Sequence, residues 1–96
     1  MQQRSSNNSE KYYESKYGRL AIYNGDNYSD WLRTSEAALA VSGALLFVEG
    51  EQEEEEGNKY NRKCVTAGIK ILFNSVSAPY QARIREPIRN RNLVQI

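Results

Sequence analysis

The residues that could carry out chemistry in this chain are few, and their types exclude most catalytic sites. The sequence contains no histidine and a single cysteine, Cys64, so it offers no Ser–His or Cys–His pair and no common Cys/His zinc pattern. Asp26 and Asp30 flank the expected start of a helix, where capping explains two carboxylates better than acid–base chemistry. The chain also has no glycine-rich phosphate loop. We therefore expect a non-enzymatic protein with no cofactor and no small-molecule substrate.

Charge is distributed unevenly along the chain. The net charge of +1 excludes a globally basic nucleic-acid-binding protein. Six glutamates lie within residues 49–56, and because they lack the alternating ligand spacing of a calcium loop, we interpret them as a solvated acidic loop between helices. Four arginines gather near the C-terminus: Arg83, Arg85, Arg89 and Arg91. They are candidate contacts with RNA phosphates or with the acidic loop of a neighbouring copy, although a solvated helix face is the simpler explanation.

No stretch of the sequence resembles a signal peptide or a membrane span. Residues 1–9 lack an apolar segment, and the longest apolar run, residues 43–48, is far shorter than the roughly 20 residues that cross a bilayer. We expect a cytoplasmic protein that does not bind membranes. A chain of 96 residues has room for one domain, and the lone Cys64 is interpreted as a small core residue.

A turn followed by a helix start leads to the only tryptophan of the chain. Asn24 and Gly25 form a turn signal, because glycine tolerates positive φ and asparagine can bond its own backbone. Asn27 is a preferred N-cap residue, and Asp30 three residues later completes the pattern of a capping box. Apolar and small residues at helical spacing follow from Trp31 onward. The pattern predicts a helix over residues 27–42.

Further elements are predicted on both sides of this helix. Residues 1–18 are interpreted as a disordered polar leader, and 19–23 as a short extended segment. Gly43 is the expected C′ residue of the first helix, and residues 44–48 form a short second one. Asn58 is expected to cap a long helix that runs to residue 73. Ser77 is expected to cap a last helix that Pro87 stops. The expected fold is all-α, a small bundle of three to four short helices.

Two motifs in this region resemble the N-terminal Gag region of copia-type LTR retrotransposons. Residues 24–31 fit the pattern x-G-x-N-Y-x-x-W, and residues 43–50 share the glycines and valine of a G-L-W-x-x-V-x-G segment. The signature residues are Gly25, Asn27, Tyr28, Trp31, Gly43 and Gly50. An acidic linker and an A-x-x-x-I helix follow in the family, and residues 51–56 and 67–71 occupy those places. The resemblance covers about residues 19–84.

The resemblance implies a structural protein, the N-terminal part of a Gag capsid that self-associates. Trp31, Leu39, Ile71 and Leu72 would then belong to the core, and exposed parts of residues 45–47 would contribute to contacts between copies, as would Val65 or Phe73. Its partners would be other copies of itself or a homologous Gag protein. The zinc knuckle and protease motifs of longer Gag polyproteins are not in this sequence, so RNA packaging and proteolysis are not implied.

The predicted organisation is a leader over residues 1–18, a Gag-like helical domain over 19–86, and a basic tail over 87–96. Two other functions remain open at this point. One is a nucleic-acid-binding fragment that makes weak RNA contacts through the C-terminal arginines. The other is a degenerate or domesticated element that modulates a full-length Gag.

Overall fold

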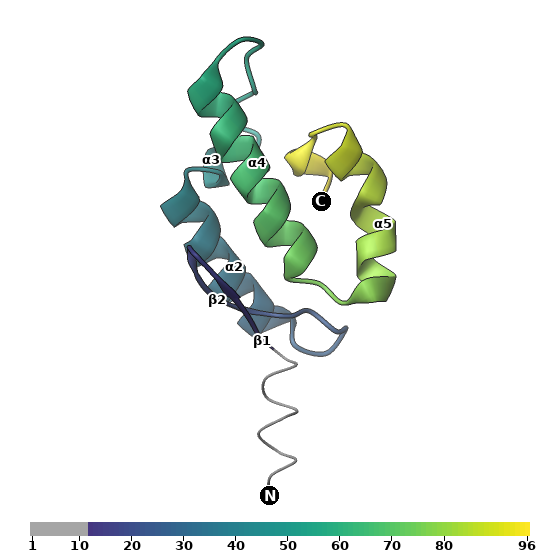
Figure 1. Cartoon of the computed structure of the whole chain (residues 1–96). Helices are drawn as coiled ribbons and strands as arrows, with labels where there is room; N and C mark the ends of the chain where they lie inside the picture. Colours follow the sequence, from purple (N-terminus) through teal and green to yellow (C-terminus); the bar gives the residue numbers. More distant parts are fainter. Residues whose placement is uncertain (1–11) are drawn as a thin grey trace, which may run out of the picture.

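The computed structural model describes residues 12–96, which form a β-hairpin, four α-helices and one 3₁₀ helix (Figure 1). The helical elements in order are α2 (Tyr28–Ser42), α3 (Leu45–Val48), α4 (Lys59–Asn74), α5 (Ala78–Arg89) and the 3₁₀ helix η1 (Leu93–Gln95). The protein is therefore mostly helical, as expected, but the all-α class is only roughly right because of the hairpin. No helix in the described part of the chain combines the length and apolar character needed to cross a membrane.

The hairpin joins β1 (Tyr12–Ser15) to β2 (Gly18–Ala21) as an antiparallel pair. Glu14 lies opposite Arg19, and its carboxylate accepts a hydrogen bond of 2.6 Å from the guanidinium. Such cross-strand pairs stabilise a sheet weakly when exposed. The prediction of a disordered leader is wrong for residues 12–18, while residues 1–11 lie outside the part of the chain described.

β2 is held by burial against α2. The side chains of Leu20 and Ala21 are almost completely buried, at 0 % and 1 % exposure. The backbone N–H of Ala21 also donates a 3.0 Å hydrogen bond to the Thr34 hydroxyl of α2. Burial of apolar surface is worth about 25 cal/mol per Å², so these two side chains fix β2 against α2. The short, polar β1 can then stay paired with a strand that is already held in place. The hairpin is therefore part of the packed domain.

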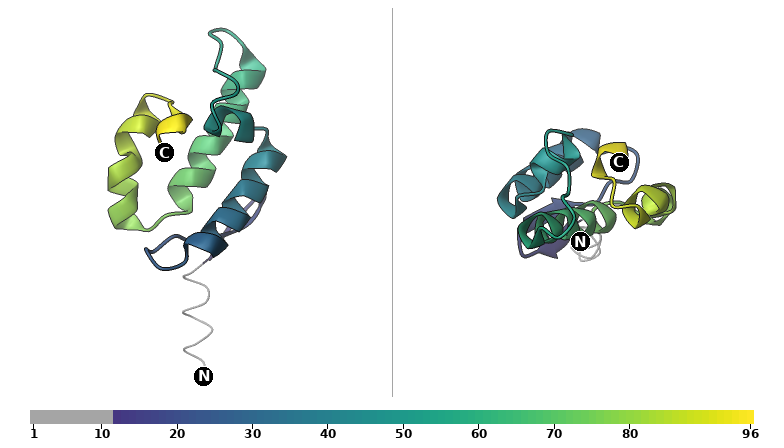
Figure 2. Two further views of the ribbon diagram at one scale, coloured as in Figure 1. Left: turned by 180° about the vertical axis from the view of Figure 1, so that it is seen from behind. Right: turned by 90° about the horizontal axis from the view of Figure 1, so that it is seen from above.

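The core lies where α2 and α4 pack side by side, with β2 of the hairpin packed against α2, and α4 lies between α2 and α5 (Figure 2). Leu39, Ile71 and Leu72 are buried as predicted, and Trp31 is half-buried against the same cluster. Cys64 is also buried, which confirms its interpretation as a core residue. Phe47 and Val65 belong to this core as well, so they do not provide the contact surface expected of them.

The helix ends follow the capping chemistry of the sequence in most cases. The Asn58 side chain accepts a 3.0 Å hydrogen bond from the backbone N–H of Asn61 and so caps α4, as predicted. Gly43 ends α2 in a left-handed conformation, and the N–H of Ala44 donates to the carbonyl of Leu39, as in a Schellman motif. Ser77 occupies the N-cap position of α5 without a capping hydrogen bond from its side chain.

The C-terminal residues differ from the prediction. Pro87 does not stop α5, which continues to Arg89. The proline removes one hydrogen bond in the last turn of a helix that contains no buried residue, so its cost is small. The expected tail over 87–96 instead turns back, and Leu93 is 2 % exposed within the core. Gly68 of α4 makes this possible, because a Cβ there would lie 2.8 Å from Leu93 Cδ1.

Candidate functional site

Four aromatic side chains gather around the turn that precedes α2. Tyr23 lies at the centre, with its ring 4.9 Å from that of Tyr80, 5.7 Å from that of Trp31 and 6.3 Å from that of Tyr28, measured between centroids. Tyr28 and Trp31 are themselves 5.7 Å apart. Tilted and edge-on pairs at these separations add roughly 0.5–1.5 kcal/mol each beyond burial. The signature tyrosine and tryptophan therefore belong to one cluster that joins α2 to α5.

Asn27 organises the turn in a way that differs from the predicted capping box. It occupies the N-cap position, but its side chain makes no capping bond to α2. Its Nδ2 donates to the carbonyl of Ile22 at 2.9 Å, and its Oδ1 accepts from the N–H of Asn24 at 3.0 Å. Asp30 forms an ion pair with Arg33 and does not reach back to the turn. Asparagine is required here because one side chain must both donate and accept.

Trp31 connects α2 to the end of α4. Its indole Nε1 donates a 2.9 Å hydrogen bond to the hydroxyl of Ser75, a residue with 0 % exposure. Backbone bonds reinforce the same junction, since the N–H of Tyr23 donates to the Ser75 carbonyl and the N–H of Ser77 donates to the Tyr23 carbonyl, at 2.7 and 3.0 Å. The indole thus contacts α4 at the C-terminal cap of that helix.

The three signature glycines all have positive φ, and two of them lie close to other side chains. A Cβ at Gly25 would lie 2.8 Å from the Tyr80 hydroxyl, and one at Gly43 would lie 2.9 Å from the sulfur of Cys64. Gly50 follows α3, with Val94 at an ordinary contact distance. Gly25 and Gly43 therefore serve backbone conformation and close packing together.

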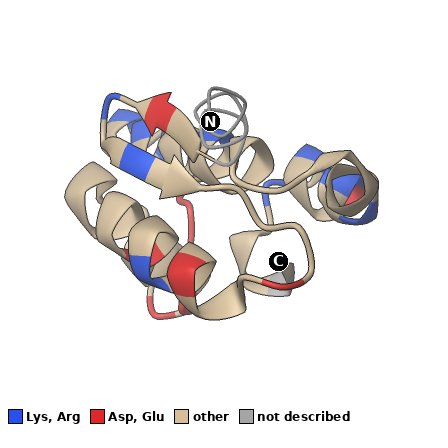
Figure 3. Ribbon diagram, turned by 90° about the horizontal axis from the view of Figure 1, so that it is seen from below, with Lys and Arg blue, Asp and Glu red and all other residues tan. Residues whose placement is uncertain are grey.

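The four C-terminal arginines do not form one surface. Arg91 is engaged within the chain, donating to both carboxylate oxygens of Glu54 at 2.8 and 2.9 Å. Arg83 stacks over the Tyr80 ring at 5.5 Å. Arg85 and Arg89 are exposed on another side of α5, because 100° per residue separates them from Arg83 by more than 100°. The charged residues of α5 are three arginines and one glutamate, and Figure 3 marks them in blue and red on the helix at its right.

The ion pair between Arg91 and Glu54 holds the C-terminus against the acidic loop. The hydrogen bond from Arg91 lowers the pKa of the Glu54 carboxyl, partial burial opposes this, and the charge of Arg62 adds to the lowering. Arg91 also donates to the Thr66 hydroxyl at 3.1 Å. The complementary charges that the sequence suggested between neighbouring copies thus meet within one chain at this position.

Comparisons supply no relative for this protein. No protein-family model, curated protein or solved structure matches the chain. The resemblance to copia-type Gag therefore rests on the signature residues themselves. In the structure these residues shape the turn, the aromatic cluster and the end of α2. None of them lines any of the three main surface hollows found within residues 12–96.

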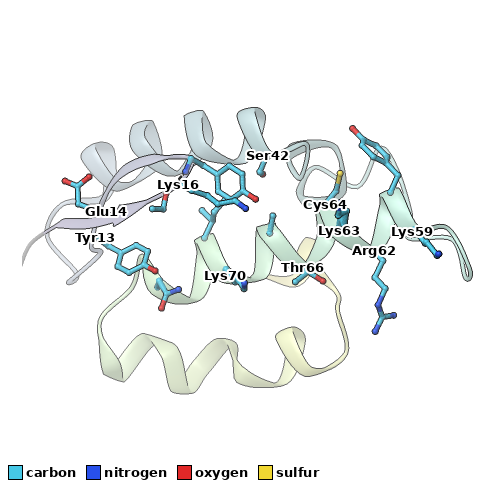
Figure 4. Close-up of a pocket in the computed structure, with 16 residues that line it drawn as sticks. Tyr13, Glu14, Lys16, Ser42, Lys59, Arg62, Lys63, Cys64, Thr66 and Lys70 are labelled. Atoms are coloured by element: carbon cyan, nitrogen blue, oxygen red, sulfur yellow. Dashed lines mark hydrogen bonds between the residues drawn. The ribbon is translucent and has the colours of Figure 1, made fainter.

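A groove that sequence reasoning missed lies between the hairpin and α4, with a volume of about 980 Å³. Figure 4 shows Lys59, Lys63 and Lys70 in succession along α4, with Tyr13 and Lys16 contributed by the hairpin. The spacing of the three α4 lysines, i, i+4 and i+11, places them on one helix face and was a signal available in the sequence. The hairpin side carries no such signal, because the polar residues 12–18 have no pattern of a strand.

The same groove contains the only cysteine, but its chemistry is structural. Cys64 is 3 % exposed, and the hydrogen bond between its thiol and Tyr60 raises the pKa of the tyrosine hydroxyl. Within residues 12–96, no three His, Cys, Asp or Glu side chains come together in a way that could hold a metal ion. The lysines and tyrosines that line this groove could instead bind a ligand through their positive charges and aromatic rings.

Proposed function

We propose that this protein is a structural, non-enzymatic, Gag-like protein of the copia type, which acts in the cytoplasm by associating with copies of itself. The observation that carries the proposal is an exposed surface of α2, in which small and apolar side chains alternate with charged ones and which no other described part of the chain covers. The signature residues support it indirectly, because their packing and hydrogen bonds shape the fold that presents this surface.

The surface, which we name the outer α2 face, contains Leu32, Ala37 and Ala40. Leu32 is 37 % exposed, and both alanines are exposed beside it. Leu45 of α3 borders the face and, with Leu32 and the alanines, lines a shallow groove. Small side chains let a second helix approach closely, and apolar side chains gain by being covered. This combination favours helix-to-helix docking.

Charge on the outer α2 face is compatible with a two-fold arrangement. Arg33 and Glu36 lie within it, between Leu32 and Ala37 around α2, and line the same groove. In a two-fold symmetric pair, residue i of one copy meets residue j of the other and the reverse, so an antiparallel α2 pair places Arg33 near the partner's Glu36. One helix pair covers less than the about 1,200–2,000 Å² of a stable interface, so we expect weak association, with a Kd on the order of 100 µM.

Size-exclusion chromatography with light scattering, over a series from 10 µM to 1 mM, tests the proposal. The expected result is a molar mass that rises with concentration above 11.0 kDa, because weak dimers populate by mass action. Ala40→Glu should abolish the rise, since it buries a charge in the contact. Glu36→Gln is the milder companion variant and should weaken association only slightly.

The matched control is Ala82→Glu on α5, an exposed alanine on a helix outside the outer α2 face. It introduces the same charge and should leave the concentration dependence unchanged. A protein that stays at monomer mass up to 1 mM contradicts the proposal. Equal effects of the two glutamate variants would contradict the assignment of the face. If the protein co-purifies with a homologous Gag and Ala40→Glu does not, the outer α2 face also serves the alternative function, in which this protein modulates a full-length Gag.

A further inference from the structure

The groove between the hairpin and α4 concentrates the positive charge of the protein. Five basic residues and one acidic residue line it, which leaves eight basic and eleven acidic residues in the rest of the chain. The basic residues are Lys16, Lys59, Arg62, Lys63 and Lys70. The single acid, Glu14, is already paired with Arg19. A nearly neutral protein therefore carries one strongly positive surface, which attracts polyanions.

Aromatic side chains lie within this positive surface. Tyr13 and Tyr60 line the groove and are 38 % and 68 % exposed, while Tyr17 is half-buried with the Lys16 ammonium 5.5 Å from its ring centroid. The exposed rings of these tyrosines offer apolar area that a bound ligand could cover favourably. A ligand that uses both features must combine negative charge with flat, stackable rings.

We propose that this groove binds single-stranded nucleic acid, with the lysines contacting phosphates and the tyrosines stacking on bases. Proteins that bind single strands without sequence preference combine these two features, a positively charged groove and aromatic platforms. An acidic polypeptide would satisfy the lysines and leave the tyrosines without a role. The inference concerns a different surface from the outer α2 face and does not depend on self-association.

The dimensions of the groove agree with a short single strand. Lys59 and Lys70 are eleven residues apart on one face of α4, a distance of about 17 Å along the helix at 1.5 Å per residue. At a spacing of 3.4 Å per stacked nucleotide, this length accommodates about five nucleotides. Within the described chain none of the four lysines forms an ion pair, so their charges are available to phosphates.

Fluorescence anisotropy with a labelled 15-nucleotide oligouridine in 50 mM NaCl tests the proposal. Four phosphate contacts predict a slope of about −3 for log K against log salt, so affinity should fall about 50-fold between 50 and 200 mM NaCl. The triple variant Lys59→Gln/Lys63→Gln/Lys70→Gln should reduce the slope to about −1. Tyr13→Leu should weaken binding at least fivefold with an unchanged slope, because it removes stacking alone.

The matched control removes three positive charges outside the groove, in Arg83→Gln/Arg85→Gln/Arg89→Gln, and should keep the wild-type slope. Circular dichroism checks that each variant is folded. Absence of saturable binding up to 100 µM protein would overturn the proposal, and so would an equal loss in the arginine control. Tighter binding of a 15-residue polyglutamate peptide than of the oligouridine would overturn it in favour of an acidic polypeptide. Ala40→Glu should bind the oligouridine like the wild type, which separates this test from that of self-association.

Discussion

Gly43 is a signature glycine whose contribution to stability can be measured as a change in the free energy of unfolding. It has φ of +85°, and a Cβ there would lie 2.9 Å from Cys64 Sγ and 3.4 Å from the Tyr60 hydroxyl oxygen. Gly57 is a control within the same chain, because its φ of +83° is nearly identical and a Cβ there would meet nothing within 4 Å. The two substitutions to alanine thus share backbone strain and differ in packing.

The expected costs follow from these geometries. Gly57→Ala should lower the free energy of unfolding by about 1 kcal/mol, the cost of a left-handed non-glycine residue. Gly43→Ala should cost roughly 2–4 kcal/mol, because overpacking against a buried sulfur adds about 1–3 kcal/mol. Cys64→Ala in the Gly43→Ala background should recover at least about 1 kcal/mol relative to simple addition of the two effects, since it removes the clashing atom.

Urea denaturation of the reduced protein, followed by circular dichroism and by Trp31 fluorescence, measures all four variants. Coincident transitions from the two probes would show that the free energies are comparable. A loss for Gly43→Ala no greater than that for Gly57→Ala would refute the packing argument. Additive effects of Gly43→Ala and Cys64→Ala would refute it as well, because they would place the strain elsewhere.

Three further changes test other contacts by the same denaturation assay. Glu54→Gln should lower the free energy of unfolding by about 1 kcal/mol at pH 7. Because the folded-state pKa of Glu54 is lowered, this difference between wild type and variant should disappear as the pH falls below about 4.5. A difference that persists unchanged at pH 3 would contradict the ion pair. Trp31→Phe should cost about 1–2 kcal/mol and couple to Ser75→Ala, whereas strict additivity would exclude the hydrogen bond between them. Asn27→Asp should cost about 1 kcal/mol because aspartate cannot donate to the Ile22 carbonyl; an unchanged stability would mean that Asn27 acts only as a helix cap.

The helical part of the fold could be predicted because its signals are local. Asn58 and Gly43 mark helix ends by their own chemistry, and the apolar spacing along α4 specifies its buried face. The second strand overlaps the extended segment expected over residues 19–23, but the hairpin that pairs it with β1 could not be predicted in this way. Its two-residue turn is Lys16–Tyr17, which lacks the Asn-Gly type of signal, and its exposed first strand has no apolar alternation. Its stability comes from Leu20, whose burial depends on helices that follow in the sequence.

The sites show the same division between local and long-range information. The resemblance placed Trp31 in the core, but Ser75, which accepts the indole hydrogen bond, is 44 residues away and has no sequence mark of that role. Arg91 is a candidate RNA contact in the sequence, but in the structure it forms an ion pair with Glu54, 37 residues earlier. The basic groove requires Lys16 and Lys70 to be neighbours, and only the placement of the hairpin beside α4 brings them together.

The central claim, that copies of this protein associate through the outer α2 face, is tested most directly by residue-resolved NMR. Amide ¹H–¹⁵N spectra recorded from 20 µM to 1 mM report each position separately. We predict that Leu32, Ala37 and Ala40 shift or broaden as concentration rises, while Arg85 on α5 stays unchanged. Spectra that are identical across the series, or changes confined to α5, would contradict the claim.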